Sequence, residues 1–396
     1  MIDLDRISAV ARELAFPRYP GTPGDERAMA LLESRLGESG LAVEREPFTY
    51  DVRPAFRALR ALLIGAALLL LGAGLLAATA PWLAAGLLVV ALGAGGVFLG
   101  WAPWLESIYA REGPTATANI QARRLAAPSS AGRDRAPRLS LILVAHHDSK
   151  SQNLSMPVRG AWTLLALLGA LGVAVGVAWS VAGDRPPAWP GEAGGLLAAV
   201  ALLVLSTLRS GNRSPGGVDN AGSVGILVEL ARVLPAQAPA DVDLWFLSPG
   251  AEEDHMVGAM RWLDAHADSL AGRPAWVLNL DGAGIPGRVV LLERFGFGRL
   301  FSAELSAVAR TVARREGIAV RGVMLPPAMG VDAIPFAHRG LPALTLSSGS
   351  LGRAAMSVHS AADVADNLDR TALDEAARLA AGMALELMAD EKTPGP

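Results

Sequence analysis

Apolar runs of two lengths alternate with polar stretches along the chain. The first long run, residues 61–105, carries no charge and as a helix would extend about 67 Å, twice a hydrocarbon core of roughly 30 Å. Pro81 near its middle predicts a reversal, so we expect transmembrane helices at about 61–80 and 82–102. A second uncharged run, 160–183, predicts a third at about 161–182.

A fourth transmembrane helix is predicted at about 190–208, and it is borderline in length. Only residues 193–208 are free of charge, which is short for a crossing unless the helix begins at Trp189 and Pro190. The four predicted helices form two hairpins, at 57–106 and 159–209.

Short apolar runs bounded by polar residues predict buried strands, and they alternate with segments of helical period. This alternation predicts an α/β fold, a three-layer α/β/α sandwich around a mostly parallel mixed sheet. One domain would be assembled from three polar stretches, 1–56, 107–158 and 210–390, followed by a disordered tail, 391–396. The predicted strands are 139–145, 242–247, 276–280, 289–292 and 343–346, and the predicted helices are 220–234, 256–266, 300–315 and 370–387.

Composition supports the membrane prediction and narrows the chemistry. The chain is 52% hydrophobic and 18% charged, with a mean hydropathy of +0.35, which is too apolar for a wholly soluble protein of 396 residues. A net charge of −3 without a basic stripe argues against nucleic acid as a partner. Because there is no cysteine, any metal must be held by histidine and carboxylate.

Arginines predict the orientation in the membrane. Arg60, Arg111, Arg159 and Arg209 lie at the outer ends of the two hairpins, which by the positive-inside rule are the cytoplasmic ends. The N-terminus shows no basic segment followed by an apolar core, so no signal peptide is predicted. We therefore expect a multi-pass protein of the bacterial cytoplasmic membrane, with its polar domain on the cytoplasmic side.

Acidic and histidine residues follow the predicted strands, where a parallel sheet presents side chains to a cleft. His146 and Asp148 follow the first strand, Glu252 and Glu253 the second, and Asp281 the third. Asp219 lies at the start of a predicted helix, and His359 lies near the C-terminal end. Such a sulfur-free set suits a hydrolytic centre of two metal ions. Of two adjacent glutamates, one can bind metal while its neighbour acts as general base.

The ordered set resembles the co-catalytic zinc aminopeptidases, the family of bacterial leucyl aminopeptidases, aminopeptidase Y and the glutaminyl cyclases. The resemblance covers nearly all of the polar part. It rests on Ala-His-His-Asp-Ser at 145–149, Gly-Val-Asp-Asn at 217–220, Glu-Glu at 252–253 with Gly-Ala at 258–259, Asn-Leu-Asp at 279–281, Asp332 with Pro335-Phe336, and His359 with Asp363.

The resemblance implies a role for each residue in a centre of two Zn²⁺ ions, with Mn²⁺ or Co²⁺ also compatible with the ligand types. Asp219 would bridge the ions, with Glu252 as general base to a bridging hydroxide and Asp148 orienting the ring of His146. Asp332 would support the site similarly. The remaining ligands would be His146 and Asp281 on one ion, and Glu253 and His359 on the other.

The expected function is therefore a membrane-anchored di-zinc metallopeptidase, an aminopeptidase that removes N-terminal residues. The second hairpin interrupts the chain between Asp148 and Asp219, which predicts a site close to the membrane and a membrane-proximal peptide substrate. All three tyrosines, Tyr19, Tyr50 and Tyr109, precede the catalytic segments, so no tyrosine is expected as oxyanion donor near the last ligand.

Three other functions remain open, and so do the substrate side chain, the native metal and the oligomeric state. His-His-Asp-Ser-Lys at 146–150 also resembles the glutaminyl cyclases, which are acyltransferases, although the spacing from Glu253 to Gly258 favours a peptidase. A non-catalytic membrane scaffold would usually lack a ligand, and here every position is filled. A transporter is disfavoured because the uncharged runs that form the spans hold no ionisable residue. Four further histidines are expected to be partner-bonded or exposed: His147, His255, His266 and His338.

Overall fold

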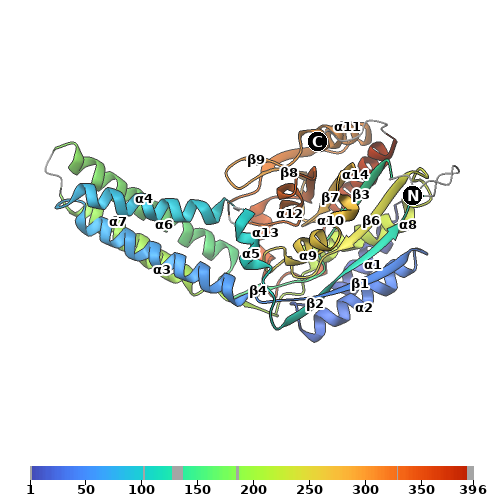
Figure 1. Ribbon diagram of the computed structural model, residues 1–396, viewed down its shortest axis with the longest axis horizontal. Coiled ribbons are helices and arrows are strands. Elements are labelled where there is room, and N and C mark those ends of the chain that lie inside the picture. The colour runs from blue at the N-terminus through green and yellow to red at the C-terminus, as the bar shows by residue number, and fades with distance from the viewer. Residues whose placement is uncertain (1, 101–102, 127–136, 184–186, 328, 390–396) are drawn as a thin grey trace. The chain divides into compact units, whose positions relative to one another are not determined.

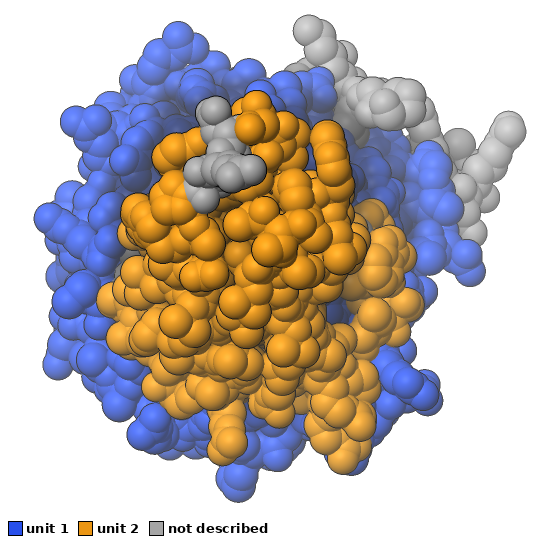
Figure 2. Space-filling model, turned by 90° about the vertical axis from the view of Figure 1, so that its left-hand side faces the viewer, with its two compact units in different colours: residues 1–51, 109–151, 211–396 blue, residues 52–108, 152–210 orange. Residues whose placement is uncertain are grey.

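The structure is a computed structural model that describes residues 2–100, 103–126, 137–183, 187–327 and 329–389 (Figure 1). The chain forms two compact units, coloured separately in Figure 2. Unit 1 comprises residues 1–51, 109–151 and 211–396, and unit 2 comprises residues 52–108 and 152–210. The predicted tail, 391–396, and the end of the predicted span 82–102 lie outside the described residues.

Unit 1 is built on a nine-stranded mixed sheet in the order β1-β2-β6-β3-β7-β11-β8-β10, with β9 paired to β8. Its centre, β6-β3-β7-β11, is parallel, whereas β1 and β2 are antiparallel additions and β8 runs against β11. This arrangement agrees with the predicted α/β fold around a large, mostly parallel sheet. The strands are β1 (Ala42–Tyr50), β2 (Thr115–Arg124), β3 (Leu139–Val144), β6 (Val242–Ser248), β7 (Ala275–Leu280), β8 (Val289–Phe295), β9 (Arg299–Leu300), β10 (Val320–Met324) and β11 (Ala343–Ser348).

All five predicted strands are present, as β3, β6, β7, β8 and β11. Their buried residues form continuous apolar runs, whereas β2 is buried at residues 117–122 but alternates polar and apolar residues. The sequence prediction missed β1, β2, β9 and β10. In β1, residues of intermediate burial alternate with exposed ones, and charged residues such as Glu44 and Arg45 interrupt the pattern. An edge strand of this kind produces no apolar run.

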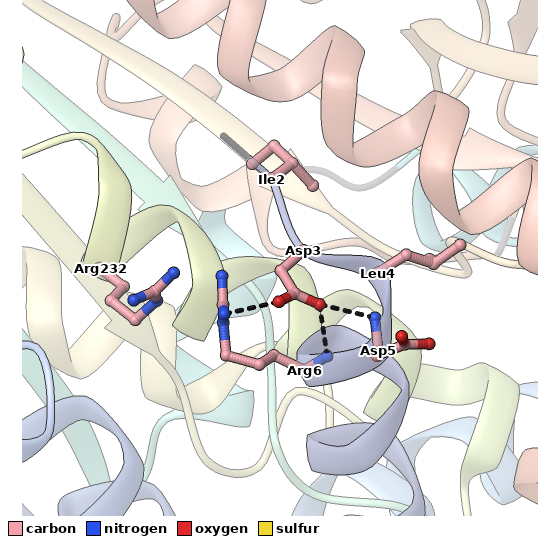
Figure 3. Close-up of a pocket in the computed structure, with 6 residues that line it drawn as sticks. All are labelled: Ile2, Asp3, Leu4, Asp5, Arg6 and Arg232. Atoms are coloured by element: carbon pink, nitrogen blue, oxygen red, sulfur yellow. Dashed lines mark hydrogen bonds and ion pairs between the residues drawn. The ribbon is translucent and has the colours of Figure 1, made fainter.

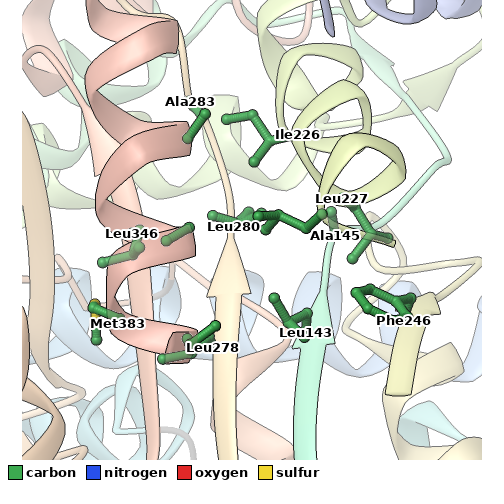
Figure 4. Close-up of a cluster of buried hydrophobic side chains, with 14 of the residues drawn as sticks. Leu143, Ala145, Ile226, Leu227, Phe246, Leu278, Leu280, Ala283, Leu346 and Met383 are labelled. Atoms are coloured by element: carbon green, nitrogen blue, oxygen red, sulfur yellow. The ribbon is translucent and has the colours of Figure 1, made fainter. Parts of the chain in front are cut away.

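Helices pack on both faces of the sheet, because alternate strand residues point to opposite sides. On one side Leu143, Phe246 and Leu278 belong to a core cluster that also contains Ile226 and Met383 from two helices (Figure 4). On the other side Trp245 meets Trp262 edge-on, with ring centroids 5.3 Å apart. The helices of unit 1 are α1 (Leu4–Leu14), α2 (Pro23–Gly37), α8 (Gly222–Val233), α9 (Val257–Ala265), α10 (Ala267–Leu270), α11 (Ala303–Glu316), α12 (Ala333–His338), α13 (Leu351–Ser357) and α14 (Arg370–Ala389), with short helical turns η2 (Gly217–Ala221) and η3 (Ala365–Asn367).

Unit 2 consists mainly of four apolar helices, α3 (Arg53–Leu76), α4 (Pro81–Leu99), α6 (Met156–Val181) and α7 (Trp189–Ser206). Glycines allow close packing between them: a Cβ added at Gly74 would lie 2.3 Å from the carbonyl oxygen of Gly191. Large apolar side chains remain on the outside, for example Leu68 and Val89, which are 65% and 67% exposed. The remaining short elements of the chain are η1 (Pro103–Leu105), α5 (Glu106–Tyr109), β4 (Ser151–Gln152) and β5 (Ser210–Gly211).

Among the described residues, three helices, α3, α6 and α7, are long and apolar enough to cross a membrane, rather than the four predicted. The helix α4 is not one of these three, and residues 101–102 of the predicted span 82–102 lie outside the described residues. The fourth predicted span was borderline in length. The helix α7 begins at Trp189, about one turn before the uncharged run 193–208, so it is long enough to be a candidate span.

Candidate metal centre

The candidate site lies at the edge of the sheet where the parallel strands end. His146 follows β3, Glu252 and Glu253 follow β6, and Asp281 follows β7 directly. Because β6, β3 and β7 are neighbours, their carboxyl ends deliver these side chains to one place, as the sequence predicted. Asp219 comes from the turn η2 in front of α8, and His359 comes from the segment after α13.

Two groups of side chains are arranged as metal ligands, and they share one residue. In the first, atoms of His146, Asp219 and Asp281 lie within 4.8 Å of one another. The Nε2 atom of His146 is 3.3 Å from Asp219 Oδ1 and 4.0 Å from Asp281 Oδ1. We call this group the His146 position.

The second group, which we call the His359 position, comprises Asp219, Glu253 and His359. The Nε2 atom of His359 is 3.0 Å from Glu253 Oε2 and 3.4 Å from Asp219 Oδ2. Asp219 therefore presents Oδ1 to one histidine and Oδ2 to the other, which is the geometry expected of a bridging carboxylate. The two groups have the membership that the family resemblance implied.

The donor atoms fit metal ions of the zinc type. Ligands at about 2.0–2.1 Å around a tetrahedral ion lie about 3.3–3.4 Å apart. Three of the histidine–carboxylate separations are close to this value, at 3.3, 3.0 and 3.4 Å, and that between His146 and Asp281 is longer, at 4.0 Å. Moreover, the buried Nε2 of His146 has no hydrogen-bond partner among the described residues. A buried ring nitrogen aimed at carboxylates without a hydrogen bond is suited to coordination.

Asp148 contacts both His146 and the backbone of the two adjacent glutamates. Its Oδ1 is 3.4 Å from the Nδ1 of His146, and its two carboxylate oxygens accept the backbone N–H groups of Glu252 and Glu253, each at 3.1 Å. The Nδ1 of His146 is also 3.2 Å from the backbone carbonyl oxygen of Asp148. Asp148 thus orients the His146 ring through its backbone and its side chain, and its carboxylate fixes the turn that carries both glutamates.

Glu252 lies beside the His146 position without belonging to either group. Its Oε2 is 3.8 Å from His146 Nε2, and the residue is 8% exposed. Burial raises the pKa of Glu252 well above its usual range, and the neighbouring carboxylates of Asp281, Asp332 and Glu253 raise it further, whereas His146 opposes the shift. A carboxyl group with this environment is suited to proton transfer.

Asp332 is fully buried, and neither of its carboxylate oxygens has a hydrogen-bond partner among the described residues. Burial raises its pKa to about 8, and the carboxylates of Asp148 and Asp281 add to the effect. Asp281 shows the same behaviour, with a pKa raised to about 7 by burial and by Asp219 and Glu253. The site thus concentrates more negative charge than its protein groups offset, which favours cations.

The sequence analysis assigned no role to two supporting residues, Asp363 and Arg18, and named Asp363 only as part of the family resemblance. Asp363 accepts the backbone N–H groups of Val218 at 2.8 Å and Asp219 at 3.3 Å, so it fixes the backbone of the shared ligand. Arg18 is fully buried and donates to the carbonyl oxygens of His147 and Gly216, among others. Only contacts between distant segments reveal these roles.

Two of the tyrosines that precede the catalytic segments lie next to them in the fold. The hydroxyl groups of Tyr19 and Tyr50 donate to the carboxylate of Asp254, at 2.9 and 2.6 Å. Burial raises the pKa of Asp254 to about 6. Because Asp254 directly follows Glu253, these hydrogen bonds help to anchor the glutamate turn.

The other histidines make contacts outside the two groups. His147 is buried, with Nδ1 3.1 Å from the carbonyl oxygen of Ser248 and Nε2 3.7 Å from Asp25. His255 stacks on Tyr109 with ring centroids 4.2 Å apart. The Nε2 of His266 is 2.7 Å from Glu46 Oε1. The ring of His338 lies near that of Phe295, with centroids 5.8 Å apart.

A surface pocket of 520 Å³ lies elsewhere, at the start of α1 and near the end of α8 (Figure 3). Arg6 and Asp3 pair within it at 2.6 Å, and no member of either metal group lines it. Its lining residues are Ile2, Asp3, Leu4, Asp5, Arg6 and Arg232.

A mixed α/β sheet that gathers histidines and carboxylates at its carboxyl edge is typical of hydrolytic metalloenzymes. The model of peptidase family M28 matches residues 200–384. This match confirms the resemblance to the co-catalytic zinc aminopeptidases and the predicted class of metallopeptidase.

Solved structures agree on the fold. BSAP, a zinc aminopeptidase from Bacillus subtilis, is 14% identical with a TM-score of 0.58, and the match covers 100% of this chain and 97% of that one. The aminopeptidase from Aneurinibacillus sp. strain AM-1 is 14% identical with a TM-score of 0.56, covering 97% and 93%. The Fimbriiglobus ruber glutaminyl cyclase is 14% identical with a TM-score of 0.55, covering 97% and 95%. No curated protein matches the chain.

Proposed function

We propose that the protein is a membrane-anchored aminopeptidase that binds two zinc ions and hydrolyses the first peptide bond of its substrates. The observation that carries the proposal is the carboxylate of Asp219, whose two oxygens face His146 and His359 at 3.3 and 3.4 Å. Each histidine has one further carboxylate beside it. This arrangement supports two ions rather than one.

Each ion would have three protein ligands, which leaves room for water and substrate. His146, Asp219 and Asp281 would hold one ion, and Asp219, Glu253 and His359 the other. When bound, the ions would polarise the scissile carbonyl, acidify the attacking water and offset the carboxylate repulsion at Glu252. Zinc is favoured by the solved aminopeptidase of this fold, although the ligand types also accept Mn²⁺ or Co²⁺.

Glu252 is the general base in this proposal. It would take a proton from the attacking water and deliver it to the leaving amine. Its backbone is fixed by Asp148 Oδ1 at 3.1 Å, and its side chain is beside the His146 position without occupying it. Asp148 therefore acts as a positioning residue for both the base and a ligand.

The membrane anchor would be unit 2, whose helices α3, α6 and α7 are long and apolar enough to cross a bilayer. The chain leaves unit 1 after Asp51 and Ser151 and returns at Tyr109 and Gly211. Asp51 follows the end of β1, and Ser151 follows the turn that contains His146, so both exits belong to the sheet edge that carries the metal centre. This topology supports peptides at the membrane surface as substrates.

The proposal is tested by metal analysis of the purified full chain together with a panel of aminoacyl amides and dipeptides. We expect two zinc ions per chain and release of N-terminal residues. Glu252→Gln should retain both ions and lose at least about 100-fold in kcat, the scale of general-base catalysis. Glu304→Gln, an exposed residue of α11, is the matched control and should remain active.

Other results would decide between the alternatives. Cyclisation of peptides with N-terminal glutamine, without hydrolysis, would make the protein a glutaminyl-cyclase-like acyltransferase. Full activity of Glu252→Gln would refute the mechanism. Extraction of the chain from membranes by alkaline carbonate would refute the anchor.

The side of the membrane can be tested because the chain has no cysteine. In Glu38→Cys, which introduces a thiol at an exposed position of unit 1, an impermeant maleimide should label the protein only after cells are lysed. Labelling of intact spheroplasts would place the catalytic unit outside the cytoplasm.

A further inference from the structure

Lys150 is an unusual residue in this chain. The sequence has 35 basic residues, and only Lys150 and Lys392 among them are lysines. Lys150 is partly buried beside the metal centre, with 15% of its side chain exposed. A compact ammonium with three rotatable donors therefore occupies a place where the chain otherwise uses arginine.

The contacts of Lys150 are concentrated on Glu253, a member of the His359 position. The ammonium donates to the backbone carbonyl of Glu253 at 2.6 Å and lies 2.9 Å from its Oε2. That same Oε2 is 3.0 Å from the Nε2 of His359. The Lys150 ammonium therefore contacts the same oxygen of Glu253 that would bind the ion at the His359 position.

The His146 position has a different electrostatic environment. Its described ion pairs join His146 to Asp148, Asp219, Glu252 and Asp281, and none of them involves a lysine or arginine. Negative charge therefore surrounds this position, whereas a fixed positive charge adjoins the other. Like charges at close range in a buried site repel strongly.

We propose that Lys150 makes the two metal positions unequal, so that the ion at the His359 position binds more weakly and exchanges more readily than the ion at the His146 position. The inference rests on the proposed two-ion function and adds the order in which the ions load. It assigns to the charge of Lys150 an electrostatic effect on metal affinity at the His359 position.

The sign of the effect follows from the contacts that remain when the side chain is removed. The backbone N–H of residue 150 donates to Glu253 Oε1 at 3.1 Å, and Asp148 accepts the backbone N–H of Glu253 at 3.1 Å. Glu253 stays oriented by these two bonds. Loss of the ammonium therefore removes repulsion without releasing the ligand.

The experiment is calorimetric titration of the metal-free, purified full chain with buffered Zn²⁺. We expect two binding steps in the wild type, the weaker of which is lost in Glu253→Gln. Lys150→Met should tighten the weaker step at least tenfold and leave the stronger step within about threefold. Lys150→Arg keeps the charge and should retain the difference. Arg321→Met, which removes a positive charge from β10, is the matched control and should change neither step.

Three outcomes would overturn the inference: equal affinities in the wild type, no change in Lys150→Met, or weaker binding in that variant. If circular dichroism shows that Lys150→Met does not fold, Lys150→Gln carries the same expectation with a side chain that still donates hydrogen bonds. If the wild type binds fewer than two ions, the proposed function itself fails. Two ions whose affinities do not respond to Lys150 contradict this inference alone.

Discussion

Gly258 lies in the first turn of α9 and packs against Gly250, just before the turn that carries Glu252 and Glu253. Replacing Gly258 by alanine should therefore disrupt the metal centre, although Gly258 is not a ligand. A Cβ at this position would lie 2.1 Å from the carbonyl oxygen of Gly250 and 2.6 Å from Asn119 Oδ1. Asn119 also donates to the carbonyl of Gly258 at 3.0 Å. Because the nearest obstacle is backbone, the segment that carries Glu252 and Glu253 must shift.

The magnitude follows from the cost of overpacking. Extra methylenes in a packed core typically cost about 1–3 kcal/mol, and a clash with backbone belongs at or above the upper end. We expect Gly258→Ala to lose about 3 kcal/mol. At roughly 2–4 °C per kcal/mol for domains of this general size, the midpoint of thermal unfolding should fall by about 6–12 °C. Displacement of both glutamates should also reduce bound zinc and activity.

The matched control is Gly37→Ala at the end of α2, where an added Cβ meets nothing within 4 Å. There the substitution should be neutral or stabilise by up to about 1 kcal/mol, since alanine restricts the unfolded chain. Both variants are compared by thermal unfolding in detergent, zinc content and turnover. A Gly258→Ala protein that unfolds within about 2 °C of the wild type and keeps its zinc would refute the reasoning.

Three further predictions concern other parts of unit 1. Arg18→Lys leaves at least two of the five carbonyls now bonded to Arg18 without a donor, and should lower the free energy of unfolding by about 2–6 kcal/mol, measured by denaturant titration. Burial would raise the pKa of Glu229, but Arg6 lowers it overall. Its stabilising contribution is therefore present above the unfolded pKa of about 4.3 and is lost as pH falls through the lower folded pKa; the difference in melting midpoint between wild type and Glu229→Gln should shrink as pH falls. Chelation by EDTA should lower the melting midpoint, and zinc should restore it, because ions that bind only the folded state stabilise it.

The sequence predicted the centre of the sheet and the residues that gather at its edge. Strands such as β3 and β7 are buried on both faces, so their apolar runs are visible without a structure. A ligand that directly follows such a strand, as Asp281 follows β7, is placed by the strand itself. The grouping of His146, Asp219 and Asp281 came from the family resemblance, because spacing alone does not show which ligands share an ion.

Residues whose role depends on contacts between distant segments could not be predicted. Arg18 is an arginine in a polar segment, and nothing in its neighbours indicates that it reaches the carbonyls of His147 and Gly216. The partnership of Lys150 with Glu253 spans 103 positions.

The contacts of Arg18 explain how a metal centre tolerates a long insertion between two of its ligands. Unit 2 contributes residues 152–210 between the turn of His146 and the turn of Asp219. Closing a flexible loop costs about 0.6 kcal/mol for each doubling of its length, so extending a connection of roughly ten residues to about 70 costs only about 2 kcal/mol.

The bonds between the two turns are sufficient to offset such a cost. Arg18 donates to carbonyls on both turns, and Ser149 Oγ donates to the carbonyl of Ser214 at 2.9 Å. Net contributions of about 0.5–1.5 kcal/mol per hydrogen bond, and more for a charged donor, together exceed 2 kcal/mol. The relative positions of His146 and Asp219 are therefore set by a side chain from the N-terminal segment rather than by the connection between them, and that connection is free to carry membrane helices.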